Sequence, residues 1–159
     1  MNNFLRLVAA LLISLAAGWI GSFFTTSQIL TWYAVLNKPF FNPPDYVFAP
    51  VWTTLYVLMG ISLFLIWKNK NSKKEKAKSQ GIELYFAQLL FNIFWSIVFF
   101  GLHSPLAGLI AIVILWILIF KTIKVFSKVD KTAAYLLYPY LFWVSFASIL
   151  NLFVVLLNR

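Results

Sequence analysis

Five long stretches of mainly apolar residues alternate with shorter polar segments along this chain. A helix rises about 1.5 Å per residue, so roughly 20 such residues cross the ~30 Å hydrocarbon core of a bilayer. The stretches cover Phe4–Phe24, Tyr46–Trp67, Ile82–Phe100, Pro105–Phe126 and Thr132–Leu157. The pattern predicts an all-α integral membrane protein, with residues 1–159 forming a single five-helix transmembrane domain.

The composition leaves no room for a soluble domain. Hydrophobic residues make up 62% of the 159 residues and charged residues only 11%, whereas soluble domains carry about 25% charged residues. The first apolar stretch follows Arg6 and exceeds the roughly 7–15 apolar residues of a signal peptide, so we expect a retained helix. The chain has no cysteine, which excludes disulfides and cysteine metal sites.

Positive charge is distributed unevenly between the two ends of the predicted helices. Of the 13 Lys and Arg residues, all but Lys38 and Arg159 fall on the side that holds the N-terminus. Cytoplasmic segments carry such an excess, so we predict a cytoplasmic N-terminus and an external C-terminus, in a bacterial plasma membrane. This topology explains the net charge of +9 without a nucleic-acid partner. We expect the lysine-rich run Lys68–Gln80 to be a solvated, mobile connection.

The segment between the first two stretches combines aromatic rings with four of the six prolines, Pro39, Pro43, Pro44 and Pro50. Proline fixes its own φ and pushes the preceding residue toward extended backbone. We therefore expect a stiff loop that presents its rings as a lid over a flat hydrophobic ligand. Asp45 is expected to cap the helix that follows.

Three stretches carry polar and aromatic residues at four-residue spacing, which places each set on one helical face. The sets are Trp52, Tyr56 and Gly60; Gln88, Asn92 and Ser96; and Trp143, Ala147 and Asn151. Facing one another, they would form an apolar cavity with a few directed hydrogen bonds, which is typical of a small-molecule site. The alternative is that Gln88 and Asn92 only hydrogen-bond between helices.

The first and fourth stretches show different patterns. Ala10, Ser14 and Gly18 give the first stretch a small-residue face that packs within the bundle or forms a dimer. The fourth stretch is almost uniformly apolar, so we expect it to face lipid. Trp19 is expected in an interfacial belt or against lipid.

The titratable residues do not indicate hydrolytic or metal chemistry. His103 is the sole histidine, and one histidine without nearby carboxylates does not build a zinc or di-iron site. We interpret it as a polar turn residue, with an axial haem ligand as the alternative. The four carboxylates form no general acid–base pair, and no metal site is predicted.

Several separated motifs give this chain a resemblance to a known family. They are Trp32-Tyr33, Lys38-Pro39, Pro43-Pro44, Pro50-Val51-Trp52, Leu55-Tyr56, Gln88, Asn92, Trp95-Ser96, Phe99-Phe100-Gly101, Leu136-Leu137-Tyr138-Pro139-Tyr140-Leu141, Trp143, Phe146-Ala147 and Leu150-Asn151. In this order they resemble the TspO/translocator protein family, also known as tryptophan-rich sensory proteins and peripheral-type benzodiazepine receptors.

The resemblance implies a pocket for porphyrins and benzodiazepine-type ligands between the second, third and fifth helices, under the first loop. The expected ligand-binding residues are Tyr33, Pro43, Trp52, Tyr56, Gln88, Asn92, Trp95, Trp143 and Ala147. Lys38 belongs to the loop that is expected to cover the ligand, where its ammonium group could meet a porphyrin propionate. A solvated loop charge is the favoured interpretation of Lys38.

The expected function is a membrane receptor or sensor of tetrapyrroles such as porphyrin or haem, with no cofactor beyond that ligand. The alternatives are an enzyme that degrades porphyrin through Trp52 and Trp143, which match the tryptophans implicated in that activity, and a carrier of porphyrins or lipids. Membrane lipids and a homodimer are the expected partners. Sterol binding is disfavoured because Asn151–Arg159 lacks the tyrosine of the family's cholesterol motif.

Overall fold

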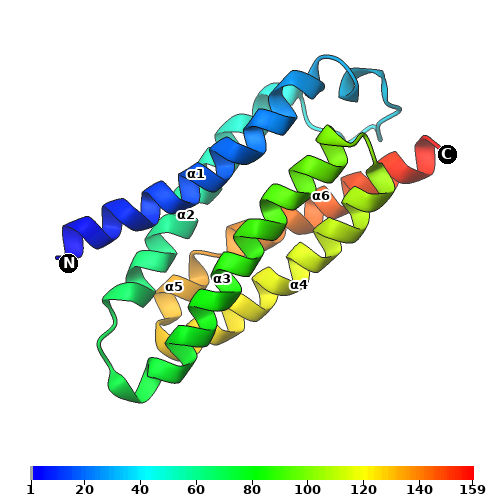
Figure 1. Ribbon diagram of the computed structural model, residues 1–159. Coiled ribbons are helices and arrows are strands. Elements are labelled where there is room, and N and C mark those ends of the chain that lie inside the picture. Colours follow the sequence, from blue (N-terminus) through cyan, green and yellow to red (C-terminus); the bar gives the residue numbers. More distant parts are fainter. Residues whose placement is uncertain (1) are drawn as a thin grey trace.

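The computed structural model describes residues 2–159, and every regular element in that range is helical (Figure 1). The long helices are α1 (Asn3–Ile29), α2 (Phe48–Lys68), α3 (Glu75–Ser96), α4 (Pro105–Val129) and α6 (Tyr138–Leu157). The short elements are α5 (Lys131–Tyr135), the 3₁₀ turns η1 (Tyr33–Val35), η2 (Asp45–Val47) and η3 (Ser72–Lys74), and the π-helical turn η4 (Ile97–Gly101). Five helical segments are long and apolar enough to cross a membrane, which confirms the predicted five-helix transmembrane fold.

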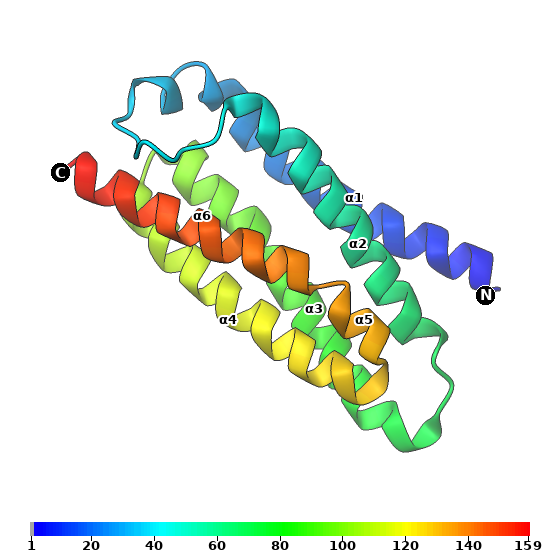
Figure 2. The ribbon, with the colours of Figure 1, turned by 180° about the vertical axis from the view of Figure 1, so that it is seen from behind.

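The five long helices form one bundle in which α1 and α2 pack together against a group made by α3, α4 and α6 (Figures 1 and 2). Helix α1 also contacts α3, and α5 contacts α2 at the end opposite the first loop. The two ends of the described chain lie at opposite ends of the bundle (Figure 1). The loop between α1 and α2 lies at the same end as the C-terminus (Figure 2).

The fifth predicted span is divided into α5 and α6. The break falls at Leu136–Leu137, just before Pro139 in the first turn of α6. Proline has no amide hydrogen, and its ring collides with the carbonyl four residues earlier, so it is tolerated only in a first turn. Periodicity alone could not reveal the break because both parts are apolar.

The prediction for the lysine-rich run was wrong in part, because α3 begins at Glu75 rather than Ile82. Lys74 Nζ donates to the carbonyl oxygen of Val129 at 2.8 Å, and Lys78 Nζ donates to that of Asn69 at 3.0 Å. These lysines satisfy carbonyl groups where α4 and α2 end, which is a favourable place for positive charge. The run therefore has defined structure and ties three helices together.

Asp45 does not cap α2. The helix has Val47 at its N-cap position, and no side chain accepts a hydrogen bond there. Pro44 is extended, and Asp45 opens the separate turn η2 ahead of the helix. The extra turn moves the first helical amides beyond the reach of the Asp45 carboxylate.

The expectation that the fourth helix faces lipid was wrong for one of its two faces, whereas the other face exposes apolar residues such as Leu106, Ile110 and Ile117. Helix α4 packs against both α3 and α6, and it buries Ile112, Leu115, Ile119 and Phe126 completely. An apolar side chain fits a lipid-facing or a protein-facing position equally well, so a uniform sequence does not distinguish them.

The small-residue face of α1 packs inside the bundle. Ala10, Ser14, Ala17 and Gly21 are buried, and a Cβ atom added to Gly60 of α2 would lie 2.9 Å from the Leu11 Cα. Small residues thus allow the close backbone approach of α1 and α2.

Candidate functional site

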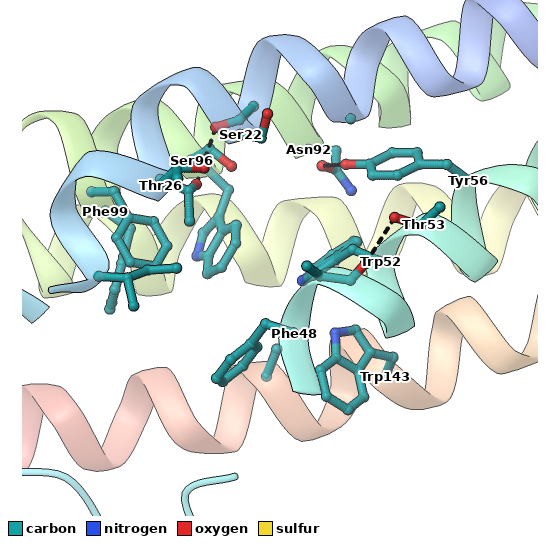
Figure 3. A pocket seen from close by; sticks show the side chains of 18 of the residues that line it. Ser22, Thr26, Phe48, Trp52, Thr53, Tyr56, Asn92, Ser96, Phe99 and Trp143 are labelled. Carbon is teal, nitrogen blue, oxygen red and sulfur yellow. Dashed lines mark hydrogen bonds between the residues drawn. The ribbon is translucent and has the colours of Figure 1, made fainter. Parts of the chain in front are cut away.

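A cavity of about 480 Å³ lies between the helices at the end that carries the first loop (Figure 3). Helix α2 contributes Phe48, Ala49, Trp52, Thr53 and Tyr56; α3 and η4 contribute Asn92, Trp95, Ser96, Phe99 and Phe100; and α6 contributes Trp143, Ala147, Leu150, Asn151 and Val154. From α1 come Leu15, Gly18, Trp19, Gly21, Ser22, Thr25, Thr26 and Ile29, and Tyr33 of the loop completes the lining.

Most of the residues predicted for the site line this one cavity. They are Tyr33, Trp52, Tyr56, Asn92, Trp95, Trp143 and Ala147. Pro43 and Gln88 are not among the lining residues. Pro43 lies in the loop, where its carbonyl accepts from Asn42 Nδ2 at 3.1 Å. Gln88 is buried one turn before Asn92 on α3.

The wall formed by α1 was missed by the sequence analysis. Its lining residues recur at three- and four-residue spacing from Leu15 to Ile29, which is one helical face. The glycines and hydroxyl side chains on this face were a usable signal, because they interrupt an otherwise apolar helix. We had interpreted the small residues only as a packing surface.

Aromatic rings from α2, α3 and η4 form a continuous wall. Trp52 stacks on Tyr56 with ring centroids 5.8 Å apart and lies 6.3 Å from Trp95. Trp95 in turn stacks on Phe99 at 5.6 Å. Such faces bind flat aromatic molecules by offset stacking. Between α2 and α6, Phe48 meets Trp143 edge-on at 6.1 Å (Figure 3).

Behind this wall, a chain of buried hydrogen bonds joins α2, α3 and α6. The Tyr56 hydroxyl donates to Asn92 Oδ1 at 2.6 Å, and Asn92 Nδ2 donates to the Tyr140 hydroxyl at 2.7 Å. The Tyr140 hydroxyl donates to Gln88 Oε1 at 2.9 Å. The amides were expected either to line a cavity or to form hydrogen bonds between helices, and the two residues differ in this respect. Asn92 lines the cavity and also bonds between helices, whereas Gln88 bonds only between helices.

Trp143 presents an unused hydrogen-bond donor at the cavity. Its Nε1 is buried without a partner in the described chain, and Figure 3 shows the indole beside Phe48 and Trp52. Trp95 Nε1, by contrast, donates to Asn151 Oδ1 at 3.2 Å. A buried N–H group without a partner costs about 1–3 kcal/mol, so Trp143 is the position at which a bound acceptor would gain most.

Tyr33 closes the loop end of the cavity. Its hydroxyl donates to Asn42 Oδ1 at 2.8 Å, and burial, together with the nearby Asp45 charge, raises the pKa of Tyr33 to about 12. Lys38 Nζ donates to the Tyr33 carbonyl at 2.7 Å and lies 4.6 Å from the centre of its ring. Lys38 is therefore held by the loop itself, rather than being a freely solvated charge.

The loop is fastened to the bundle at two further places. Asn158 of the C-terminal segment accepts from the Asn37 amide at 3.0 Å and donates to the Asn37 carbonyl at 2.9 Å. Trp32 stacks on His103 at 4.7 Å, and His103 Nε2 lies 2.8 Å from Gln28 Oε1. His103 has a positive φ of 51°, as expected of a residue in a tight turn. Within residues 2–159, no group of three His, Cys, Asp or Glu side chains could hold a metal ion.

Comparisons with known proteins agree with this architecture. Residues 10–157 match the TspO/MBR family. The chain is 47% identical to the tryptophan-rich protein TspO of Archaeoglobus fulgidus, over 98% of this chain and 99% of the relative. It is 46% identical to the tryptophan-rich protein TspO of Chlorobaculum tepidum, over 99% of this chain and 98% of the relative.

Similarity extends to animal proteins. The translocator protein of Homo sapiens is 38% identical over 84% of this chain and 78% of the relative. A match over nearly the whole length, to relatives that are nearly half identical, requires common ancestry rather than chance likeness between apolar helices. This chain is therefore an integral membrane protein that belongs to the TspO/MBR family.

Proposed function

We propose that this protein is a membrane receptor or sensor that binds tetrapyrroles, or similar planar hydrophobic molecules, in the cavity walled by α1, α2, α3 and α6. Relatives carry the names tryptophan-rich sensory protein, in Cereibacter sphaeroides, and translocator protein, in mammals. The basic residues gather at the end opposite the loop, which supports a cytoplasmic N-terminus and an external loop. The Lys-, Asn- and Ile-rich composition favours a bacterial plasma membrane as the host membrane.

One observation carries this proposal: a wall of stacked rings and the indole of Trp143, whose buried Nε1 has no hydrogen-bond partner within residues 2–159, belong to the lining of one cavity. The volume of about 480 Å³ falls within the roughly 300–1,000 Å³ typical of small-molecule sites. A flat macrocycle would stack against Trp52 and Trp95. An acceptor oxygen or nitrogen on the ligand would pair with Trp143 Nε1, which has no hydrogen-bond partner among residues 2–159.

A second candidate function has its own observation. Trp52 and Trp143, the two tryptophans expected in porphyrin breakdown, both line the cavity, so a bound porphyrin would meet both indoles. Illumination of the protoporphyrin complex in air separates the two functions. At protoporphyrin concentrations that saturate both proteins, turnover that Trp143→Phe abolishes favours the enzyme; absence of turnover in both proteins favours the receptor.

The binding proposal is tested by filling the cavity. Ala147 is a buried cavity residue of α6, and Ile149 on the same helix is about half exposed and is not a cavity residue. Protoporphyrin IX is titrated into the parent, Ala147→Phe and Ile149→Phe proteins in lipid nanodiscs, with tryptophan quenching as the readout. We expect Ala147→Phe to lose at least about tenfold in affinity, near 1.4 kcal/mol. Equal affinity in all three proteins would refute binding in this cavity.

A further inference from the structure

The most exposed of the residues that line the cavity lie on α1 and α2. On α3 and α6, Asn92, Phe99 and Asn151 are almost fully buried. On α1 and α2, by contrast, Trp19 is 76% exposed and Thr53 is also exposed, although both line the same cavity. The cavity therefore opens between α1 and α2, toward the outside of the bundle.

The end that faces the aqueous phase is closed. Tyr33 covers it and is only 6% exposed, and its hydroxyl is held by Asn42. The loop is fixed to the C-terminal segment by the two hydrogen bonds between Asn37 and Asn158. Opening this end would break several interactions at once, whereas the side between α1 and α2 needs no such change.

With the end of α1 taken as the boundary of the hydrocarbon core, the open side lies within that core. Trp19 precedes Ile29, the last residue of α1, by ten positions, which is about 15 Å along the helix axis and half of the ~30 Å core of a bilayer. On α2, Thr53 follows the first residue, Phe48, by five positions, or about 7.5 Å. The opening thus runs from near the middle of the membrane toward the loop side.

The rim of the opening suits contact with lipid. The Ser22 hydroxyl donates to the Trp19 carbonyl at 2.7 Å, and the Thr53 hydroxyl donates to the Ala49 carbonyl at 2.8 Å. Their hydrogen-bonding hydrogens are used within their own helices, which removes the cost of facing hydrocarbon with an unpaired donor. On the side nearer the N-terminus the opening ends where the Tyr56 ring packs directly on Gly18.

We propose that molecules reach the cavity laterally from the bilayer, through the opening between α1 and α2. The Trp19 side chain partly blocks this opening and must move aside when a molecule enters. The ligand class is then one that partitions into membranes, and the loop is a fixed cover rather than a gate. The identity of the ligand rests on the proposed function, but the route does not.

The test measures how fast a thiol inside the cavity is labelled. Because the chain has no cysteine, an Ala147→Cys variant carries a single thiol on the cavity wall. It is reconstituted in vesicles and treated with a lipid-soluble pyrene maleimide or with a charged, membrane-impermeant maleimide. Ile117→Cys on the exposed face of α4 and Phe40→Cys at the fully exposed loop tip calibrate the two reagents.

Three second-site changes then distinguish the routes. Trp19→Ala removes the side chain that blocks the opening. Phe23→Ala is the matched control, because Phe23 lies on the same helix and is equally exposed at 76%, but does not line the cavity. Asn158→Ala loosens the loop by removing its two hydrogen bonds to Asn37.

We expect the lipid-soluble reagent to label the Ala147→Cys variant much faster than the charged reagent, after calibration. Trp19→Ala should raise that rate by about fivefold, a barrier change near 1 kcal/mol, while Phe23→Ala and Asn158→Ala leave it unchanged. The lateral route would be overturned by faster labelling with the charged reagent or by no labelling with the lipid-soluble one. It would also be overturned if Asn158→Ala accelerated labelling, or if Trp19→Ala and Phe23→Ala had equal effects. Protoporphyrin titration of the same parent protein is a separate readout, so loss of the proposed ligand leaves the route testable.

Discussion

The Tyr56 hydroxyl donates a 2.6 Å hydrogen bond to Asn92 Oδ1, and this bond links α2 to α3 at the base of the cavity. It also orients the Asn92 amide, because the oxygen accepts from Tyr56 while the nitrogen donates to Tyr140. The wall of the site and the packing of the bundle therefore share the same groups. A change at one of them affects stability and binding to different degrees, which makes the two separable by experiment.

Tyr56→Phe removes this hydrogen bond and keeps the ring that stacks on Trp52. Interhelical hydrogen bonds in membranes contribute about 0.6–2 kcal/mol, so we expect unfolding stability to fall by roughly 1 kcal/mol. Porphyrin affinity should change much less than in Ala147→Phe. Tyr135→Phe, on the exposed face of α5, is the control. Unchanged thermal stability of Tyr56→Phe would show that the bond contributes nothing.

Trp143→Phe and Trp95→Phe should differ in their effects, the first lowering ligand affinity and the second lowering stability. Trp143 Nε1 has no protein partner, so its loss should leave stability equal or slightly higher. Affinity for a ligand carrying a carboxylate should fall about tenfold, because hydrogen bonds to charged groups contribute about 1.5–3 kcal/mol. Trp95→Phe removes the bond to Asn151 and should lower stability by about 1 kcal/mol. Thermal unfolding and porphyrin titration of both variants give the comparison, and identical behaviour would refute the assignment of the free donor.

Gly60→Ala tests the close contact between α1 and α2. A Cβ atom there would lie 2.9 Å from the backbone Cα of Leu11, which cannot move aside as a side chain can. Overpacking of this kind costs about 1–3 kcal/mol, and we expect a clearly lower unfolding temperature. At Gly101 the nearest atom would lie at 3.4 Å, an ordinary contact, so Gly101→Ala should be tolerated. Equal unfolding temperatures for Gly60→Ala and Gly101→Ala would refute the close contact between Gly60 and Leu11.

Tyr33 should make the loop sensitive to strongly alkaline pH. Its folded pKa of about 12 exceeds the ordinary value of 10.0, so burial favours the neutral phenol. The resulting stabilisation is complete below pH 10 and is lost as the pH rises toward 12. The difference in unfolding temperature between the parent and Tyr33→Phe should shrink over that range. A difference that stays constant between pH 9 and pH 11.5 would contradict the buried, neutral Tyr33.

The sequence predicted the membrane-spanning segments well, but it predicted poorly which faces of α1 and α4 line the cavity or pack against other helices. Apolar length alone predicts five segments long enough to cross a membrane, and Trp52, Asn92 and Trp143, chosen by their spacing, lie on three helices that line one cavity. The wall from α1 was missed because glycine, serine and threonine serve close packing and cavity lining equally well. The buried face of α4 was missed because lipid and protein interior select the same apolar residues.

Other features depended on interactions that no local pattern encodes. Lys74 and Lys78 bond to carbonyl groups at the ends of α4 and α2, and the partner of Lys74, Val129, lies 55 residues away in sequence. Lys38 was expected to be solvated, yet it bonds to the backbone of its own loop. The free donor at Trp143 became visible only when the partners of each indole nitrogen were known, since Trp95 and Trp143 look equivalent in the sequence.

The most direct measurement is an experimental structure of the protein with protoporphyrin IX bound in lipid. The account predicts the macrocycle between Trp52, Trp95 and Trp143, stacked on the first two and with an acceptor atom within hydrogen-bonding distance of Trp143 Nε1. A macrocycle bound on the outer surface of the bundle, with the cavity empty, would contradict it.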